Sequence, residues 1–158
     1  MPKHTISILV GNHAGVLSRI SGLFSRRGYN IDSLAVGVTE NPEVSRITVV
    51  VNGDDYMAGQ VEKQLNKQID VLSVTNIKKS ELIARELLLV KLYAGEEERE
   101  RLDDIAKTAG AKVADEGGGS VTFELSDTTE KIDRFLELLA FVKQKEVART
   151  GVLALQEG

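Results

Sequence analysis

Asn12 and Gly15 stand where backbone groups of the chain could bind a small anion. The residues before them, 5–10, alternate strongly apolar with smaller side chains, which predicts a strand with one apolar face. The residues after them place apolar side chains at helical spacing, on a stripe formed by Val16, Leu17, Ile20, Leu23 and Phe24. A strand is therefore expected to lead through a glycine turn into a helix.

The start of such a helix suits a carboxylate. Its first N–H groups have no partner inside the helix, and the helix dipole adds partial positive charge there. Gly15 has no Cβ, so a ligand could approach the backbone closely. The alternative is that Asn12 only caps the helix and Gly15 only permits the turn. The spacing alone leaves both interpretations open.

The first half of the chain, residues 1–79, predicts a complete small domain. Gly28 is expected to end the first helix, and Asp54 or Asp55 to begin a second one that carries Met57, Val61, Leu65 and Ile69. Strands are expected at 5–10, 30–39, 45–51 and 71–77. The order strand, helix, strand, strand, helix, strand is that of the ferredoxin-like fold, an antiparallel sheet with both helices on one face.

The second half, residues 80–158, predicts the same order again, so the fold class is α+β with two tandem ferredoxin-like domains. Strands are expected at 86–94, 111–115, 120–125 and 147–155, with a helix at 96–109 ending at Gly110. A second helix is expected to be capped at Asp127 or Thr128, and Glu130 would complete a capping box with Asp127. Each sheet would leave one face and its edges uncovered, which predicts burial against another copy or a partner, and the alternative is a monomer whose two halves pack on each other.

Composition argues against several classes of function. The 158 residues contain no cysteine and only two histidines, which disfavours thiolate or zinc chemistry. Aromatic residues make up 4% and no strong basic patch is present, so no nucleic-acid partner is expected. No apolar run could cross a bilayer, and we expect a cytoplasmic protein without a membrane partner. The acidic run that begins at Glu96 could hold a cation or simply form a solvated helix start.

Several long stretches of the sequence resemble one known family. They are N-H-A-G-V-L-S-R-I-S-G-L-F-S-R-R-G-Y-N-I-D-S-L-A-V-G at 12–37, E-V-S-R-I-T-V-V-V at 43–51, V-E-K-Q-L-N-K-Q-I-D-V-L at 61–72, R-E-L-L-L-V-K at 85–91 and E-V-A-R-T-G-V-L-A-L at 146–155. Together they resemble the small regulatory subunit of acetolactate synthase, also called acetohydroxyacid synthase. This resemblance implies that residues 1–79 form an ACT domain.

The resemblance also implies a function. Such subunits have no catalytic residues or cofactor of their own and act on a separate large subunit, which uses thiamine diphosphate, Mg²⁺ and FAD to condense pyruvate with pyruvate or 2-oxobutyrate. They raise its activity and confer feedback inhibition by valine or another branched-chain amino acid. A free-standing ACT-type amino-acid sensor that regulates another enzyme or transcription is the alternative. A catalytic domain of a class not evident from the sequence is a third possibility.

In this family the effector lies between two ACT domains of a homodimer. The resemblance assigns two elements to this effector site: the helix-opening turn of one copy and the start of the second strand of the other copy. The expected site residues are Asn12, His13, Gly15, Val16, Leu17, Asn30 and Ile31, with Ser18 close behind. Some relatives carry an acidic residue where Gly11 stands here. The matching turn of the second half is rich in glutamate, which would repel a carboxylate ligand, so only the first half is expected to bind the effector.

Overall fold

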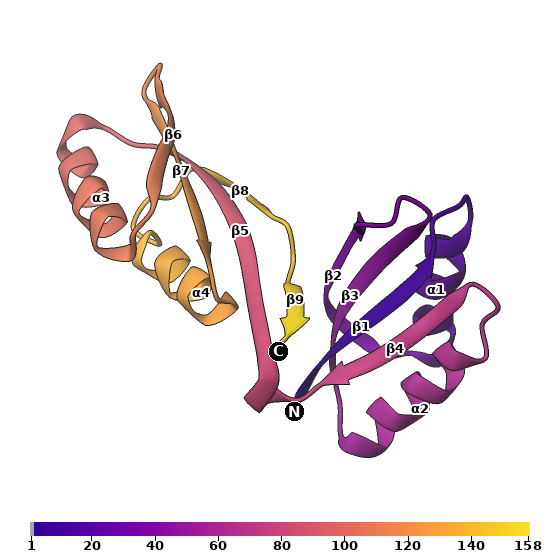
Figure 1. Ribbon diagram of the computed structural model, residues 1–158. Coiled ribbons are helices and arrows are strands. Elements are labelled where there is room, and N and C mark those ends of the chain that lie inside the picture. Colours follow the sequence, from indigo (N-terminus) through magenta and orange to yellow (C-terminus); the bar gives the residue numbers. More distant parts are fainter. Residues whose placement is uncertain (1) are drawn as a thin grey trace. The chain divides into compact units, whose positions relative to one another are not determined.

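The computed structural model describes residues 2–158, which form two compact units (Figure 1). The elements are β1 (Lys3–Gly11), α1 (Val16–Arg27), β2 (Asn30–Val38), β3 (Val44–Asn52), α2 (Asp55–Asn66), β4 (Val71–Ile77), the 3₁₀ helix η1 (Lys79–Glu81), β5 (Leu82–Tyr93), α3 (Glu96–Ala109), β6 (Lys112–Gly117), β7 (Ser120–Asp127), α4 (Thr129–Leu138), β8 (Lys145–Arg149) and β9 (Leu153–Gln156).

The boundary between the units differs in detail from the expected division at 79/80. The first unit contains the chain up to Ile83 together with Val152–Gly158, and the second is Ala84–Gly151. The expected join lies inside η1, and the last seven residues return to the first unit. The second unit is therefore inserted between two segments of the first.

The first unit is the expected ferredoxin-like fold. Its antiparallel sheet has the order β2-β3-β1-β4, with α1 and α2 packed on one face. The alternation along β1 and β3 turns every second side chain toward the helices. The buried core formed in this way consists of Ile6, Ile8, Val10, Val16, Ile20, Leu23, Phe24, Ile47, Val49, Val51, Val61 and Leu65.

The helix α2 is shorter than predicted. Asp54 is its N-cap, and the carboxylate accepts the N–H of Met57 at 2.8 Å, as the sequence suggested. The helix ends at Asn66, so Ile69 lies beyond it and its side chain is 95% exposed. The prediction that Ile69 contributes to the helix core is wrong, because the apolar spacing continues past the point where the helix stops.

The C-terminal segment covers part of the sheet face that the helices leave open. The strand β9 lies near β1, on the side away from α1 and α2 (Figure 1). The N–H of Val152 donates to Oγ of Ser33 at 2.7 Å, and Ser33 is paired with Val50 in the sheet. Val152 and Ala154 are buried. The chain itself therefore buries part of a face that we expected a partner to cover.

The second unit repeats the topology. Its sheet has the order β6-β7-β5-β8. The helices α3 and α4 bury one face of the sheet. This core consists of Leu88, Val90, Leu92, Leu102, Ala106, Val121, Phe123, Leu125, Ile132, Phe135, Leu139 and Val142.

In the second unit one local prediction is wrong, and one is decided between its two alternatives. The single strand expected at 147–155 is two strands, β8 and β9, with Gly151 between them at φ 81°. The cap of α4 is Thr128, whose hydroxyl accepts the N–H of Lys131, whereas the Asp127 carboxylate accepts the N–H of Thr128 at 2.8 Å. Of the two expected caps, the helix therefore uses Thr128, and the capping box with Glu130 was expected only for a cap at Asp127.

A buried ion pair ties three elements of the second unit together. Nε and Nη2 of Arg149, at the end of β8, donate to the two oxygens of Glu86 on β5 at 3.1 and 2.9 Å. The hydroxyl of Thr129, at the start of α4, donates to the same carboxylate at 2.6 Å. Glu86 is almost completely buried, and its hydrogen bonds raise the pKa of Arg149. The carboxylate is thus held by charge-assisted hydrogen bonds from both sides.

Candidate functional site

The turn between β1 and α1 forms an open helix start. Gly15 is the N-cap, with φ 87° in the left-handed region that favours glycine. No side chain caps the helix, and its first turn contains no acidic residue. Asn12 does not cap it, since its side-chain amide donates to the carbonyl of Pro42 at 2.9 Å. The interpretation of Asn12 as a helix cap is therefore wrong.

The first N–H groups of α1 are available to an external acceptor. The N–H of Val16 makes a long contact of 3.5 Å with the carbonyl of His13. Within residues 2–158, no acceptor is assigned to the N–H groups of Leu17 and Ser18. Such groups, together with the dipole of a twelve-residue helix, favour a bound negative charge. This end of α1 can therefore accept a carboxylate.

Three polar side chains surround the turn, those of His13, Arg19 and Asp70. Nε and Nη2 of Arg19 both donate to Oδ2 of Asp70, the former at 2.8 Å. Nε2 of His13 lies 3.1 Å from the other oxygen of Asp70. The backbone of Asp70 is also fixed, because its carbonyl accepts the N–H of Gly11 at 3.0 Å. Asp70, the residue just before β4, thus holds the side chains of His13 and Arg19 on either side of Gly15.

Sequence reasoning missed Arg19 and Asp70. It noted only that Gly11 replaces an acidic residue of some relatives. A Cβ at Gly11 would lie 3.1 Å from the ring of His13, so glycine leaves room for that ring beside Asp70. The acidic residue beside the turn is instead Asp70, which lies 51 residues after Arg19 in the sequence. No local pattern in the sequence connects the two positions.

The predicted site residues of the turn differ in what they can offer. The side chain of Val16 is buried in the core, so this residue can contribute only its backbone. Leu17 is 42% exposed and can line an apolar slot. His13 is also largely exposed, although its ring is held by Asp70.

The remaining predicted residues, Asn30 and Ile31, lie at the far end of the sheet. Asn30 begins β2 and pairs with Asn52, which pairs in turn with Lys3 at the start of β1. The helix-opening turn follows Gly11 at the other end of that strand. Eight residue steps at about 3.3 Å separate Lys3 from Gly11, or about 26 Å. One chain therefore does not bring Asn30 and Ile31 to the turn.

The strand β2 is an edge of its sheet. Its outer backbone groups face away from β3, and three alternating apolar side chains, Leu34, Val36 and Val38, are exposed along it. An exposed apolar edge of this kind favours pairing with another strand. In an antiparallel pair of two such edges, the start of one β2 meets the end of the other.

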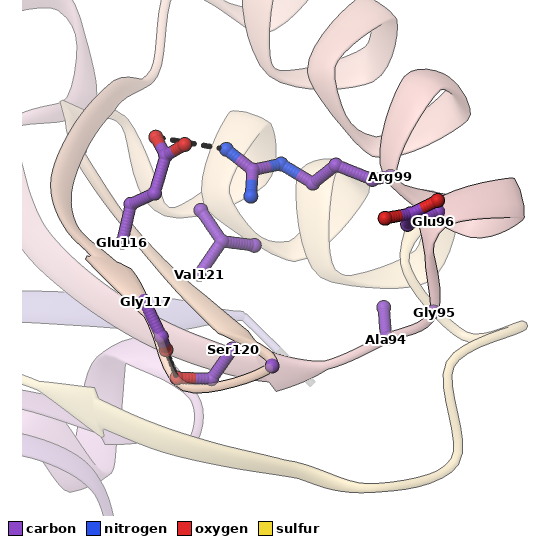
Figure 2. A pocket seen from close by; sticks show the side chains of 9 residues that line it. Ala94, Gly95, Glu96, Arg99, Glu116, Gly117, Ser120 and Val121 are labelled. Carbon is purple, nitrogen blue, oxygen red and sulfur yellow. Dashed lines mark hydrogen bonds and ion pairs between the residues drawn. The ribbon is translucent and has the colours of Figure 1, made fainter.

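The second unit offers a matched comparison at the start of α3. A hollow of about 240 Å³ lies there (Figure 2). It is lined by Ala94, Gly95, Glu96, Arg99, Glu116, Gly117, Gly119, Ser120 and Val121.

Acidic side chains already occupy this second helix start. The carboxylate of Glu98 accepts the N–H of Gly95, the N-cap, at 3.4 Å. Arg99 is paired with Asp103 and with Glu116, each at 3.0 Å, and Figure 2 shows the pair with Glu116. The hydrogen bond to Asp103, followed by that to Glu116, raises the pKa of Arg99. The start of α3 therefore satisfies its own charge and disfavours an external carboxylate.

Other chemistry finds little support in the described part of the chain. No group of three or more His, Cys, Asp or Glu side chains is placed to hold a metal ion, so the cation interpretation of the acidic run at Glu96 gains no support. None of the helices between residues 2 and 158 is long and apolar enough to span a bilayer.

Comparisons with known proteins agree over the whole length of the chain. Residues 6–73 match a family described as an AHAS small subunit-like ACT domain, and residues 85–158 match the small subunit of acetolactate synthase. A probable acetolactate synthase small subunit of Archaeoglobus fulgidus is 42% identical over 156 residues, covering 99% of this chain and 98% of the relative. The Bacillus subtilis small subunit is 42% identical, covering 99% and 91%. The crystal structure of the small subunit from Thermotoga maritima is 34% identical, with a TM-score of 0.93 and coverage of 100% and 99%.

Proposed function

This chain belongs to the family of acetolactate synthase small subunits, and on that basis we propose that it binds valine or another branched-chain amino acid at the first turn of α1 and transmits the binding to a catalytic large subunit. The chain raises the activity of the large subunit and makes it sensitive to feedback inhibition. The large subunit carries thiamine diphosphate, Mg²⁺ and FAD and performs the condensation. The small subunit contributes no catalytic residue and works beside its partner in the cytoplasm.

The observation that carries this proposal is the placement of the two predicted half-sites. The open helix start lies at one end of the first sheet, and Asn30 lies at the other. Antiparallel pairing of β2 with β2 of a second copy would bring Asn30 of that copy toward the end of the sheet where the turn lies. The homodimer therefore contains two equivalent sites, each shared by two chains.

An amino acid matches the groups that such a shared site provides. The free N–H groups of Leu17 and Ser18 bind the carboxylate, and the side-chain amide of Asn30 from the second copy accepts from the ammonium group. Leu17 and Ile31 border the aliphatic side chain. Charge-assisted hydrogen bonds contribute about 1.5–3 kcal/mol each, so two or three of them support micromolar affinity after the costs of association.

Binding can regulate the large subunit only through linkage. Valine must stabilise one arrangement of the dimer over another, and the large subunit must bind or work differently with each. A coupling free energy of about 1–3 kcal/mol corresponds to a change of roughly 5- to 150-fold in affinity. A ligand shared between two chains has this property, because its contacts depend on how the chains are placed.

Two measurements test the proposal. The purified chain is titrated with L-valine, L-leucine and L-isoleucine in a calorimeter, with L-lysine as a control whose side chain is charged. Acetolactate formation by the large subunit is then measured with and without this chain. We expect at least one branched-chain amino acid to bind, the chain to raise the activity, and the bound amino acid to lower it. Failure of all three amino acids to bind would refute the effector site.

A further inference from the structure

The side chain of Arg19 bends back over the residue that opens its own helix. Arg19 lies four residues after Gly15, on the same side of α1, and helical side chains point toward the N-terminus. A Cβ built on Gly15 would lie 3.1 Å from Nη1 of Arg19. The guanidinium group therefore lies beside Gly15, the N-cap of α1.

The orientation of this guanidinium is set by a single carboxylate. Asp70 receives Nε and Nη2 of Arg19, and its side chain is only 12% exposed. The backbone of Asp70 is held by Gly11, and its second oxygen by His13. None of the residues 2–158 provides an acceptor for Nη1, the nitrogen nearest Gly15. Arg19 thus keeps one pair of donors free while the rest of the group is fixed.

The second unit has an arginine at the corresponding position. Arg99 also lies four residues after the N-cap of its helix, Gly95. It is paired with two carboxylates, however, and Glu98 already binds the N-cap N–H. Two carboxylates therefore neutralise Arg99 beside a first turn that already contains three glutamates, whereas a single carboxylate holds Arg19 and the first turn of α1 contains no acidic residue.

We propose that Arg19 is a ligand-binding residue of the effector site, that its Nη1 donates to the carboxylate of the bound amino acid beside the N–H groups of Leu17 and Ser18, and that Asp70 is the positioning residue that holds it there. This inference rests on the proposed function, because it names a further residue of the same site. The pairing of Asp70 with Arg19 also explains why the Asp70 carboxylate can lie beside the turn without repelling the carboxylate of the ligand. The charge of Asp70 is neutralised by Arg19, and its oxygens face the arginine and His13.

The test is a calorimetric titration of the intact chain and four variants with L-valine. Arg19→Gln removes the charge and the fork, and it should raise Kd by roughly tenfold or more, as expected for one charge-assisted hydrogen bond at a half-exposed site. Arg19→Lys keeps the charge without the fixed fork and should give an intermediate Kd. Asp70→Asn should also raise Kd, because Arg19 is released. Arg99→Gln, the matched control in the second unit, should leave Kd unchanged.

A second ligand distinguishes a contact with the carboxylate from a general effect on the fold. Valinamide has the side chain and ammonium group of valine with a neutral amide in place of the carboxylate. Arg19→Gln should weaken valine binding much more than valinamide binding. Thermal unfolding of each variant identifies those that remain folded. If Arg19→Gln does not fold, Arg19→Lys is used in its place.

The outcomes separate the two proposals. If the unmodified chain binds no branched-chain amino acid, the proposed function itself fails. If it binds valine and a folded Arg19→Gln or Arg19→Lys variant binds it equally well or more tightly, the proposed function survives and the role of Arg19 is refuted. Tighter binding would mean that Arg19 blocks the site. An equal loss for valine and valinamide would also refute contact with the carboxylate.

Discussion

Replacement of Gly15 by aspartate should abolish the response to valine while leaving the chain folded. The residue has φ 87°, where a side chain costs about 1–2 kcal/mol, with aspartate and asparagine toward the lower end. The new carboxylate would in turn cap α1, which stabilises a helix by about 1 kcal/mol. The closest contact of the new Cβ is with Nη1 of Arg19 at 3.1 Å, the guanidinium nitrogen that Asp70 does not hold, so a shift of a few tenths of an ångström accommodates it. The net change in stability should therefore be about 1 kcal/mol or less.

The effect on the ligand should be much larger. The carboxylate of Gly15→Asp would accept the N–H groups that the effector needs and would repel the effector carboxylate. Loss of one or two charge-assisted hydrogen bonds amounts to about 3 kcal/mol, or more than 100-fold in Kd. Gly15→Asn is the matched control, since it has the same shape and tolerates the same backbone without the charge. It should raise Kd by only about tenfold.

The assay has two stages. Calorimetry of the purified variants with L-valine gives the two Kd values, and acetolactate formation by the large subunit shows whether each variant still activates. We expect Gly15→Asp to activate without conferring inhibition. Full sensitivity to valine in this variant would refute the assignment of the carboxylate site. An equal loss in the aspartate and asparagine variants would show that the backbone, and not the charge, is responsible.

Three further changes test other parts of the account. Asn30→Ala should weaken valine binding by roughly tenfold in calorimetry, since it removes a hydrogen bond to a charged group; unchanged affinity would exclude it as a ligand. Val36→Lys on the β2 edge should convert the proposed dimer to monomers in sedimentation equilibrium, whereas Leu72→Lys on β4, the opposite edge strand, should not. Arg149→Ala should lower the free energy of unfolding of the second unit by about 3 kcal/mol in denaturant titrations, because it leaves Glu86 buried without its cation; a change below about 1 kcal/mol would contradict this.

Local patterns in the sequence were sufficient for most of the fold. The alternation in β1, the stripe of α1 and the cap at Asp54 each depend on residues only a few positions apart. Periodicity does not report where a helix loses its packing partner, so Ile69 was placed in α2. Gly151 interrupts the last apolar run, and its position could have indicated the break between β8 and β9.

The parts that the sequence could not provide depend on distant contacts. Val152 bonds to Ser33 across 119 positions, and Asp70 bonds to Arg19 across 51. Neither pair has a periodic or motif signature. Val16 illustrates a related limit. It belongs to the apolar stripe and also to the resemblance-derived site, and only the structure shows that its side chain packs in the core.

The most direct test of a site shared by two chains is a mixture of two variants that each bind valine more weakly than the unmodified chain. Gly15→Asp damages the turn and Asn30→Ala damages the start of β2, so neither homodimer has an intact site. In a heterodimer of the two, both defects fall in one site and the other site is complete. We expect heterodimers purified with two different affinity tags to bind one valine per dimer with the affinity of the unmodified chain. If the heterodimer binds no better than either variant alone, the effector site is not shared between chains and the account is wrong.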